Sequence, residues 1–291
     1  MADLIPIRYK KLVYFDYIER LVKVEEIPAH FGVNRNDFRP TMDYSMHTDP
    51  ALKERNPNGH IFSRLTELTK PGTCFLWHSD NWVGQFFEFL VWLVGDNKPP
   101  RIIEIHPPYG KEHCKTLDAF IERYSNFEKL VNFKWPGTII AIENRNYPRK
   151  YSSVIQASNM DDLIESALDG GCNLKVMLDI PQLITELKNA GKLNKDGLSS
   201  AFRGLEKCKH HIIGIHLSGK SHNGTLDTLF EKNSVVDKDA MLKLLAAFLD
   251  DGKPRYLIPE VNSGKGDFDS IINDLMKHGF KFIDGNPYCG H

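Results

Sequence analysis

The sequence lacks the cysteine pattern of a disulfide-stapled or zinc-ribbon protein. Its 291 residues contain five cysteines, an odd number, and no C-x-x-C pair. Disulfide frameworks in small secreted folds use an even, dense set of cysteines, and zinc ribbons use closely spaced pairs. We therefore expect free thiols and the reducing environment of the cytoplasm.

Long hydrophobic runs and an apolar leader are also missing. The most apolar segment, residues 86–94, is nine residues long and contains Glu88. A membrane-spanning helix needs about 20 apolar residues. The amino-terminal stretch MADLIPIRYKK has no apolar core of the kind a signal peptide needs. These absences predict a cytoplasmic protein with no membrane span.

Charge of one sign is not in excess. Lysine and arginine number 37, aspartate and glutamate 38, and the formal net charge is −1. This balance argues against a protein that coats nucleic acid through bulk positive charge, although it leaves room for a local basic groove. The hydrophobic fraction of 41% and charged fraction of 26% are those of an ordinary globular chain.

Several catalytic and nucleotide-binding signatures are absent. No G-x-G-x-x-G follows the first predicted strand, and no G-x-x-x-x-G-K-[ST] loop occurs. No G-x-S-x-G nucleophile motif is present either. The sequence therefore lacks the strongest signals of nucleotide-binding folds and of serine hydrolases.

What the chain does contain is one recurring unit, a short apolar run that ends in a polar residue and is followed by a helical pattern. Continuous β-branched runs are typical of strands buried on both faces, as in a parallel sheet. The predicted strands are residues 42–47, 73–78, 101–106, 138–143, 174–179, 211–216 and 256–261, with a weaker run at 12–15. The predicted helices are residues 79–94, 115–131, 160–168, 198–209, 237–249 and 267–278.

Eight such runs alternating with helices predict a (β/α)₈ TIM barrel of the α/β class, in a single domain. An open doubly wound sheet is the alternative. Within this domain, residues 1–40 are expected to form an amino-terminal extension with the first strand. Residues 41–291 are expected to form the metal-binding barrel.

The polar residues that close these strands are all histidine, aspartate or glutamate. Active sites of barrels are built from the carboxyl ends of the strands, and these three side chains are the ones that bind divalent metals. Any one of them alone is more often a hydrogen-bonded structural residue. The set that would converge on the barrel mouth is His47, His78, His106, Glu143, Asp179, His216 and Glu260.

At these segments the sequence resembles the xylose-isomerase-like barrels, a superfamily that includes endonuclease IV, the UV-damage endonucleases, and sugar isomerases and epimerases. The resemblance runs from about residue 40 to 265. No segment is a strict signature alone, and the order and spacing together are more specific. The segments are IIEIHPPYG near 102–110, IIAIENRN at 139–146, VMLDIPQ at 176–182, IIGIHLSG at 212–219 and LIPEVN at 257–262.

The resemblance implies a metal site and its ligands. In all branches one divalent ion is held by four residues, which correspond here to Glu143, Asp179, His216 and Glu260. The endonuclease branch adds two histidines, His78 and His106 here, which form a second site with the bridging glutamate. One to three ions are implied, with zinc first and manganese or iron as alternatives.

The sequence departs from both repair-enzyme patterns. Endonuclease IV places a histidine where this chain has Gln182, and its D-x-H motif is missing after His216, where only His222 and Asp227 offer substitutes. The UV-damage enzymes have a lysine at the position of Gly214. His47, Gln182 and His222 therefore remain candidates for a further metal or for substrate.

The favoured function is a metal-dependent hydrolase that cleaves a phosphodiester, in nucleic acid, with a metal-activated water. Glu143, Asp179 and Glu260 are the expected catalytic residues. Substrate-binding residues are expected in the loops that follow the strands, at Tyr109, Arg145 and Lys220, and the basic loop 144–151 could contact a phosphate backbone.

The alternative is a sugar isomerase or epimerase acting on a sugar or sugar phosphate. It would need one ion, and Glu143 and Glu260 would transfer the proton. A barrel without catalytic activity is a third possibility, because fold does not imply function.

Overall fold

The computed structural model describes residues 2–6, 44–47, 77, 79–107, 114, 116–144, 160–219, 224–230, 232, 234–259 and 265–282. Its strands form one parallel eight-stranded sheet in the order β2-β3-β4-β5-β6-β7-β1-β8. They are β1 (Asp3–Pro6), β2 (Ser45–His47), β3 (Ile102–Ile105), β4 (Ile139–Glu143), β5 (Lys175–Asp179), β6 (Ile212–His216), β7 (Arg255–Ile258) and β8 (Lys281–Phe282).

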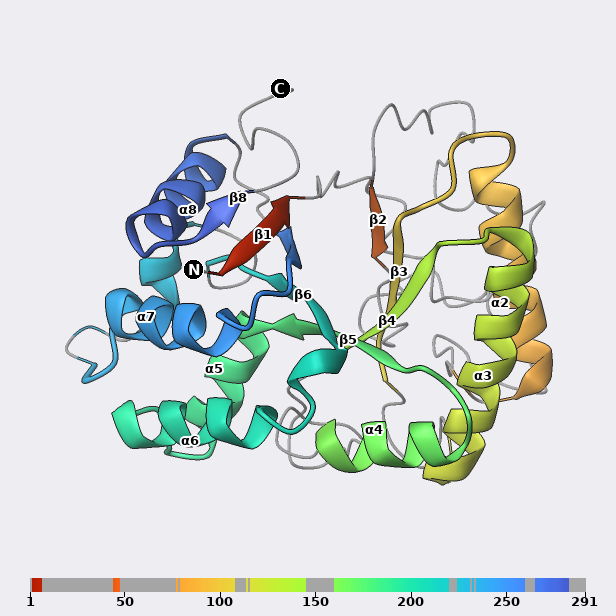
Figure 1. Cartoon of the computed structure of the whole chain (residues 1–291), viewed down its shortest axis with the longest axis horizontal. Helices are drawn as coiled ribbons and strands as arrows, with labels where there is room; N and C mark the ends of the chain where they lie inside the picture. Colours follow the sequence, from red (N-terminus) through yellow and green to blue (C-terminus); the bar gives the residue numbers. More distant parts are fainter. Residues whose placement is uncertain are drawn as a thin grey trace, which may run out of the picture.

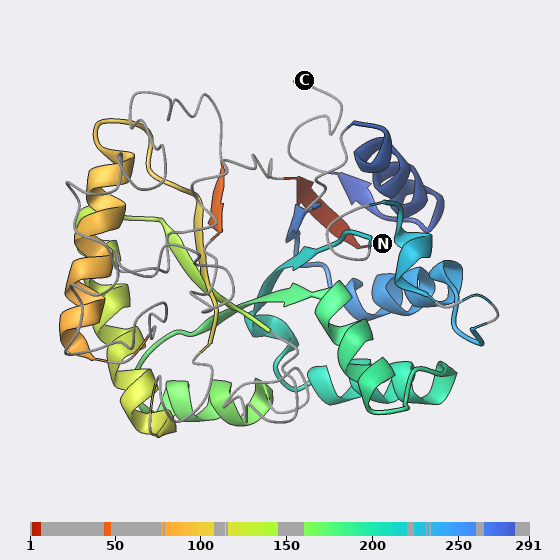
Figure 2. The same ribbon diagram turned by 180° about the vertical axis from the view of Figure 1, so that it is seen from behind.

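Helices follow most of the strands and lie outside the curved sheet. In Figure 1, α2 and α3 flank β3 and β4, and α5 to α7 lie on the opposite side of the molecule; Figure 2 shows the same layers from behind. The helices are α2 (Asp80–Val94), α3 (Leu117–Lys134), α4 (Met160–Asp169), α5 (Ile180–Asn189), α6 (Lys195–Leu205), α7 (Lys238–Leu249) and α8 (Lys265–Lys277). None of the helices in the described ranges is long and apolar enough to cross a bilayer.

Side-chain caps define where four helices begin. Thr116, Asp179, Asn194 and Asp237 each accept a hydrogen bond from the backbone N–H three residues later. Such a cap satisfies one of the amide groups that the first helical turn leaves without a partner. Three of the four caps are surface features, whereas Asp179 is also a strand-end residue of the predicted site.

The core has two layers separated by the sheet. The larger layer lies between the strands and the helices and includes Ile103, Ile105, Ile142 and Leu178. The smaller layer fills the interior of the barrel and consists of Ile102, Ala141, Met177 and Ile258, from four different strands. Because side chains alternate across a strand, the residues two positions beyond this inner layer also face the interior.

The (β/α)₈ fold is confirmed, in a single domain, with one departure in strand order. β1 lies between β7 and β8, pairing with both, so β8 does not lie between β7 and β1 as consecutive order would place it. β1 occupies residues 3–6, within the amino-terminal region predicted to hold the first strand; residues 12–15, the run expected to form it, lie outside the described residues.

The predicted strand at 73–78 is wrong at its one described residue. Trp77 lies in a turn with φ of 62°, and β2 pairs directly with β3, Ser45 opposite Ile102. A short apolar run does not distinguish a strand from a buried turn. Here the run ends in a tryptophan that packs edge-on against Phe120 of α3, with ring centroids 5.0 Å apart.

Helix α5 and strand β8 were not predicted from the sequence. Helix α5 begins directly after β5, with Pro181 in its first turn, where proline has no hydrogen-bonded N–H to lose. Strand β8 has only two residues and is defined by its pairing with β1, so its own sequence carries little signal.

Candidate metal centre

Three buried residues form a group that could hold a metal ion. One ligand atom from each of Glu104, Glu143 and His216 lies within 4.8 Å of the other two. They come from β3, β4 and β6, and no more than 1% of any of them is exposed to solvent. Carboxylate oxygen and imidazole nitrogen are ligands that zinc and other first-row divalent metals accept.

Glu104 contacts one strand beside its own and one strand across the barrel. One carboxylate oxygen, Oε1, accepts a hydrogen bond from the Ser45 hydroxyl on β2, and the other, Oε2, contacts Nε2 of His216 on β6. Ser45 is itself buried. The contacts of Glu104 thus span the barrel interior from β2 to β6.

His106 and Glu143 lie close together beside this group. Nε2 of His106 is 3.5 Å from Oε2 of Glu143, and both residues are 1% exposed. Two ligands bound at about 2.0–2.1 Å to a tetrahedral ion lie about 3.4 Å apart. The spacing of these two atoms therefore suits a shared ion as well as a direct ion pair.

Asp179 closes β5 in register with His216 of β6, and it is fully buried. One of its carboxylate oxygens, Oδ1, accepts a hydrogen bond of 2.8 Å from the backbone N–H of Gln182. The predicted ligand Asp179 is therefore also the cap of α5. Gln182, predicted as an additional ligand or substrate contact, meets it through its backbone.

A bulge in β6 aims His216 into the barrel. The β5–β6 register shifts, so that Val176 lies opposite Ile212 but Met177 lies opposite Gly214. Ile212 and Ile215 pack in the outer core, whereas Ile213 packs against the inner one. If the same residues alternated without a bulge, His216 would share the outward direction of Ile212.

The bulge requires glycine at position 214, because the neighbouring atoms leave no space for a Cβ atom. A Cβ on Gly214 would lie 2.8 Å from Cε of Met177 and 2.9 Å from the carbonyl oxygen of Tyr256. The lysine that the UV-damage enzymes have at the corresponding position does not fit this backbone.

Trp77 supports His106 from the outside. Its indole N–H donates a 2.7 Å hydrogen bond to the His106 carbonyl, and Arg123 donates a 2.6 Å hydrogen bond to the Trp77 carbonyl. A positive φ is a strained conformation for a tryptophan. The two hydrogen bonds and the aromatic packing hold it there.

Sequence reasoning missed Glu104 and Ser218. Glu104 is a carboxylate inside an otherwise apolar strand, two positions before His106, and the alternation of a strand places both on the interior face. Ser218, two residues beyond His216, is fully buried, and among the described residues its hydroxyl has no hydrogen-bond partner. A polar residue within an apolar run was the available signal for Glu104.

The remaining predicted site residues divide into two groups. His47 ends β2 with its backbone opposite Glu104, and nothing is described of its side chain. The others lie outside the described residues: His78, Tyr109, Arg145, Lys220, His222 and Glu260.

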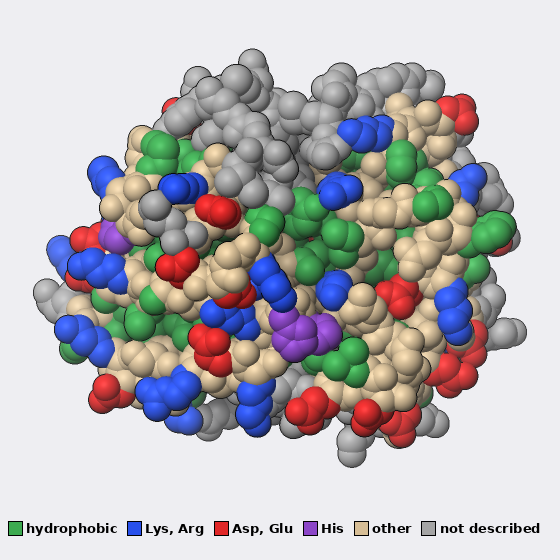
Figure 3. Space-filling view, viewed as in Figure 1, with side chains coloured by type: hydrophobic (Ala, Val, Ile, Leu, Met, Phe, Trp, Pro, Cys, Tyr) green, Lys and Arg blue, Asp and Glu red, His purple; other side chains and the backbone are tan. Residues whose placement is uncertain are grey.

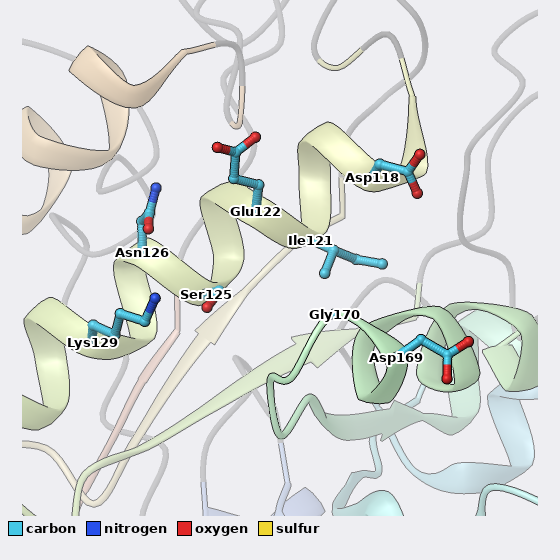
Figure 4. Close-up of a pocket in the computed structure, with 8 residues that line it drawn as sticks. All are labelled: Asp118, Ile121, Glu122, Ser125, Asn126, Lys129, Asp169 and Gly170. Carbon is cyan, nitrogen blue, oxygen red and sulfur yellow. The ribbon is translucent and has the colours of Figure 1, made fainter.

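A hollow of about 530 Å³ lies away from this centre, on the outer surface of α3. Figure 4 shows that its lining comes from α3 and from the end of α4, including Glu122, Lys129 and Asp169. None of the predicted or observed site residues takes part. This hollow is therefore separate from the buried cluster near the strand ends. We call that cluster the strand-end cluster, and it consists of Glu104, His106, Glu143, Asp179 and His216.

Comparisons with known proteins gave only remote structural likenesses. No family model matches the chain, and no curated protein matches its sequence. A D-psicose 3-epimerase from Clostridium cellulolyticum H10, solved with D-tagatose, is 13% identical with a TM-score of 0.43, covering 95% of this chain and 92% of that one. An endo-β-1,4-mannanase from Cellulomonas fimi is 12% identical with a TM-score of 0.39, covering 91% of this chain and 56% of that one.

Proposed function

We propose that the strand-end cluster binds divalent metal and that the protein is a metal-dependent phosphodiesterase acting on nucleic acid. The carrying observation is the position of Glu143, which belongs to the three-residue group and also lies 3.5 Å from His106. A carboxylate between two sets of ligands can bridge two ions, the arrangement used in many phosphoryl-transfer sites.

The charge of the cluster supports a cation. Its three carboxylates, Glu104, Glu143 and Asp179, carry up to three negative charges, whereas its two imidazoles carry at most two positive ones. All five side chains are at most 1% exposed. Because uncompensated buried charge is costly, a divalent ion would stabilise this arrangement.

When bound, a divalent ion would lower the pKa of a water to about 7 and neutralise charge on a phosphate group. Asp179 would accept a hydrogen bond from the attacking water and orient it, and Glu260 is the other candidate for that task. Arg145, Lys220 and Tyr109 would bind the flanking phosphate and base. In this hydrolysis water adds to phosphorus, the P–O bond to the leaving alcohol breaks, and the alcohol takes up a proton.

The reaction is tested together with the metal count. Protein purified without added metal, and again after loading with zinc or manganese, is analysed for metal per chain and assayed on a chromogenic phosphodiester and on abasic DNA. We expect about two ions, falling to about one in His106→Ala, with loss of hydrolysis. His278→Ala, which changes a histidine bonded to Asp239 on the helical layer, is the matched control and keeps both.

The same experiment decides the alternative. One ion that His106→Ala leaves in place, with no phosphodiester cleavage and with epimerisation of ketoses or sugar phosphates, would establish the isomerase function through Glu143 and Glu260. No bound metal after loading would overturn both functions.

A further inference from the structure

Asn144 is the first residue after β4, and it is 1% exposed. The β4–β5 ladder pairs Ala141 with Lys175 and ends with Glu143 opposite Met177. Beyond that pair, β5 continues to Asp179 while β4 has finished. The last residues of β5 therefore need hydrogen-bond partners that the β4 backbone does not supply.

The Asn144 side chain supplies them. Its Oδ1 accepts a 2.7 Å hydrogen bond from the Asp179 N–H, and its Nδ2 donates a 3.1 Å hydrogen bond to the Asp179 carbonyl. A side-chain amide has the same donor and acceptor as a peptide group. The Asn144 side chain thus replaces a further backbone pairing between β4 and β5, and it forms hydrogen bonds with both the N–H and the carbonyl of Asp179.

This pair of bonds ties two predicted ligands together. Glu143 is the chain neighbour of Asn144, and Asp179 is held by the Asn144 side chain. The cap bond from Gln182 N–H then orients the Asp179 carboxylate, and the β-ladder places Asp179 opposite His216. A shift of the Asp179 backbone would therefore move ligands on both β5 and β6.

We propose that Asn144 is a positioning residue of the metal centre, fixing the spacing between Glu143 and Asp179 through the backbone of Asp179. This inference rests on the proposed metal-binding function. Partners that hold metal ligands in place change metal affinity by about 10- to 100-fold when they are removed. The same size of effect is expected here.

Two variants separate positioning from packing. Asn144→Leu keeps the branched shape with a somewhat larger volume and removes both hydrogen bonds, whereas Asn144→Ala leaves room for water to take them. A packing role would make the alanine variant the weaker binder. A positioning role makes the leucine variant at least as weak as the alanine variant, because both lose the amide and leucine also excludes water.

Metal-free protein is titrated with Co²⁺. Calorimetry gives the binding affinity, and the visible d–d absorption of the bound ion reports the geometry of its ligands. We expect Asn144→Leu to bind about 10- to 100-fold more weakly, with an altered absorption spectrum that reports changed ligand geometry. Thermal unfolding without metal shows that each variant is folded. Asn97→Leu is the matched control, since Asn97 also donates to a backbone carbonyl, that of Val94, outside the site.

The outcomes distinguish the two proposals. Wild-type protein that binds no Co²⁺ would overturn the metal function and this inference together. Wild-type binding with an unchanged affinity and spectrum in Asn144→Leu would overturn the positioning role alone and leave the metal function standing. If Asn144→Leu fails to fold, a folded Asn144→Ala with wild-type affinity and spectrum would do the same.

Discussion

A buried arginine and a group of buried titratable side chains lie at opposite ends of this barrel, and they are compensated in different ways. At the start of β7, Arg255 is 2% exposed and makes four hydrogen bonds, two to the Asp251 carboxylate and one each to the carbonyls of Lys253 and Lys209. One cation there meets one anion and two carbonyls. Toward the other end, Glu104 contacts His216, Glu143 lies 3.5 Å from His106, and Asp179 is in register with His216.

The difference separates a structural group from a candidate binding site. Burial acts to raise the pKa of Asp251, but the hydrogen bonds and charge of Arg255 outweigh it and leave that pKa below its usual value. Asp251 therefore stays ionised and paired with Arg255 by two hydrogen bonds. The strand-end cluster has more carboxylates than imidazoles, and a bound cation would compensate the carboxylates when they are ionised.

Side chains of both charges cover the side of the outer face seen in Figure 3 among the described residues, in keeping with the net charge of −1.

Arg255→Met is expected to have the largest effect on folding. It removes the guanidinium from the solvent-accessible Asp251 carboxylate and from two carbonyls, and the loss of hydrogen bonds to a charged group costs about 1.5–3 kcal/mol. Urea denaturation measures the loss. Metal affinity of the folded variant should match the wild type, and a large loss of metal binding would show that the two groups are coupled.

Glu143→Gln is expected to weaken metal binding strongly without lowering the stability of the metal-free protein, the opposite of Arg255→Met. Metal affinity should fall by more than about 100-fold, because loss of a ligand exceeds the 10- to 100-fold cost of losing a residue that holds one. Stability without metal should be equal or higher, since one of the repelling charges is gone. Glu122→Gln, in the hollow on α3, is the control, and a stability loss in Glu143→Gln without metal would indicate an ion-pair cluster instead.

Gly214→Ala should affect both properties moderately. The added methyl group meets Met177 and the Tyr256 carbonyl at under 3 Å, so β6 must move. Overpacking of this kind costs about 1–3 kcal/mol, and displacement of His216 should weaken metal binding. Adding Met177→Ala relieves only the side-chain contact. Full recovery in the double variant, by denaturation and calorimetry, would mean that the backbone contact is harmless.

The smallest effect concerns pH at the Arg255 end. Burial lowers the pKa of His211 below its ordinary value of 6.5, with the Leu174 carbonyl acting in the other direction. Between the lowered folded pKa and 6.5, the unfolded chain binds more protons, so stability falls as pH decreases through this window. Denaturation at several pH values should show a shallower slope for His211→Gln. His210→Gln removes a neighbouring charge that also lowers the His211 pKa, so it should make the slope shallower by a smaller amount.

The sequence predicted the architecture well because burial on both faces leaves a local mark. The apolar runs at 101–106, 138–143, 174–179 and 211–216 each contain an observed strand, and His106, Glu143, Asp179 and His216 all lie at the same end of the sheet. The strand predicted at 73–78 was wrong at Trp77, its one described residue, which lies in a turn and is buried by aromatic packing against α3. Nothing in a six-residue apolar run distinguishes that environment from a sheet.

Residue types and their spacing determined the fold class and four of the candidate ligands. Tertiary structure alone decided which of them meet, since Glu104 reaches His216 across 112 positions of sequence. It also decided that His216 faces inward, because a bulge reverses the alternation that the sequence would imply. The hydrogen bonds between Asn144 and Asp179 were also decided by the tertiary structure, because they form where β4 ends before β5. Such contacts depend on relative strand lengths and register, which are set by packing of the whole barrel.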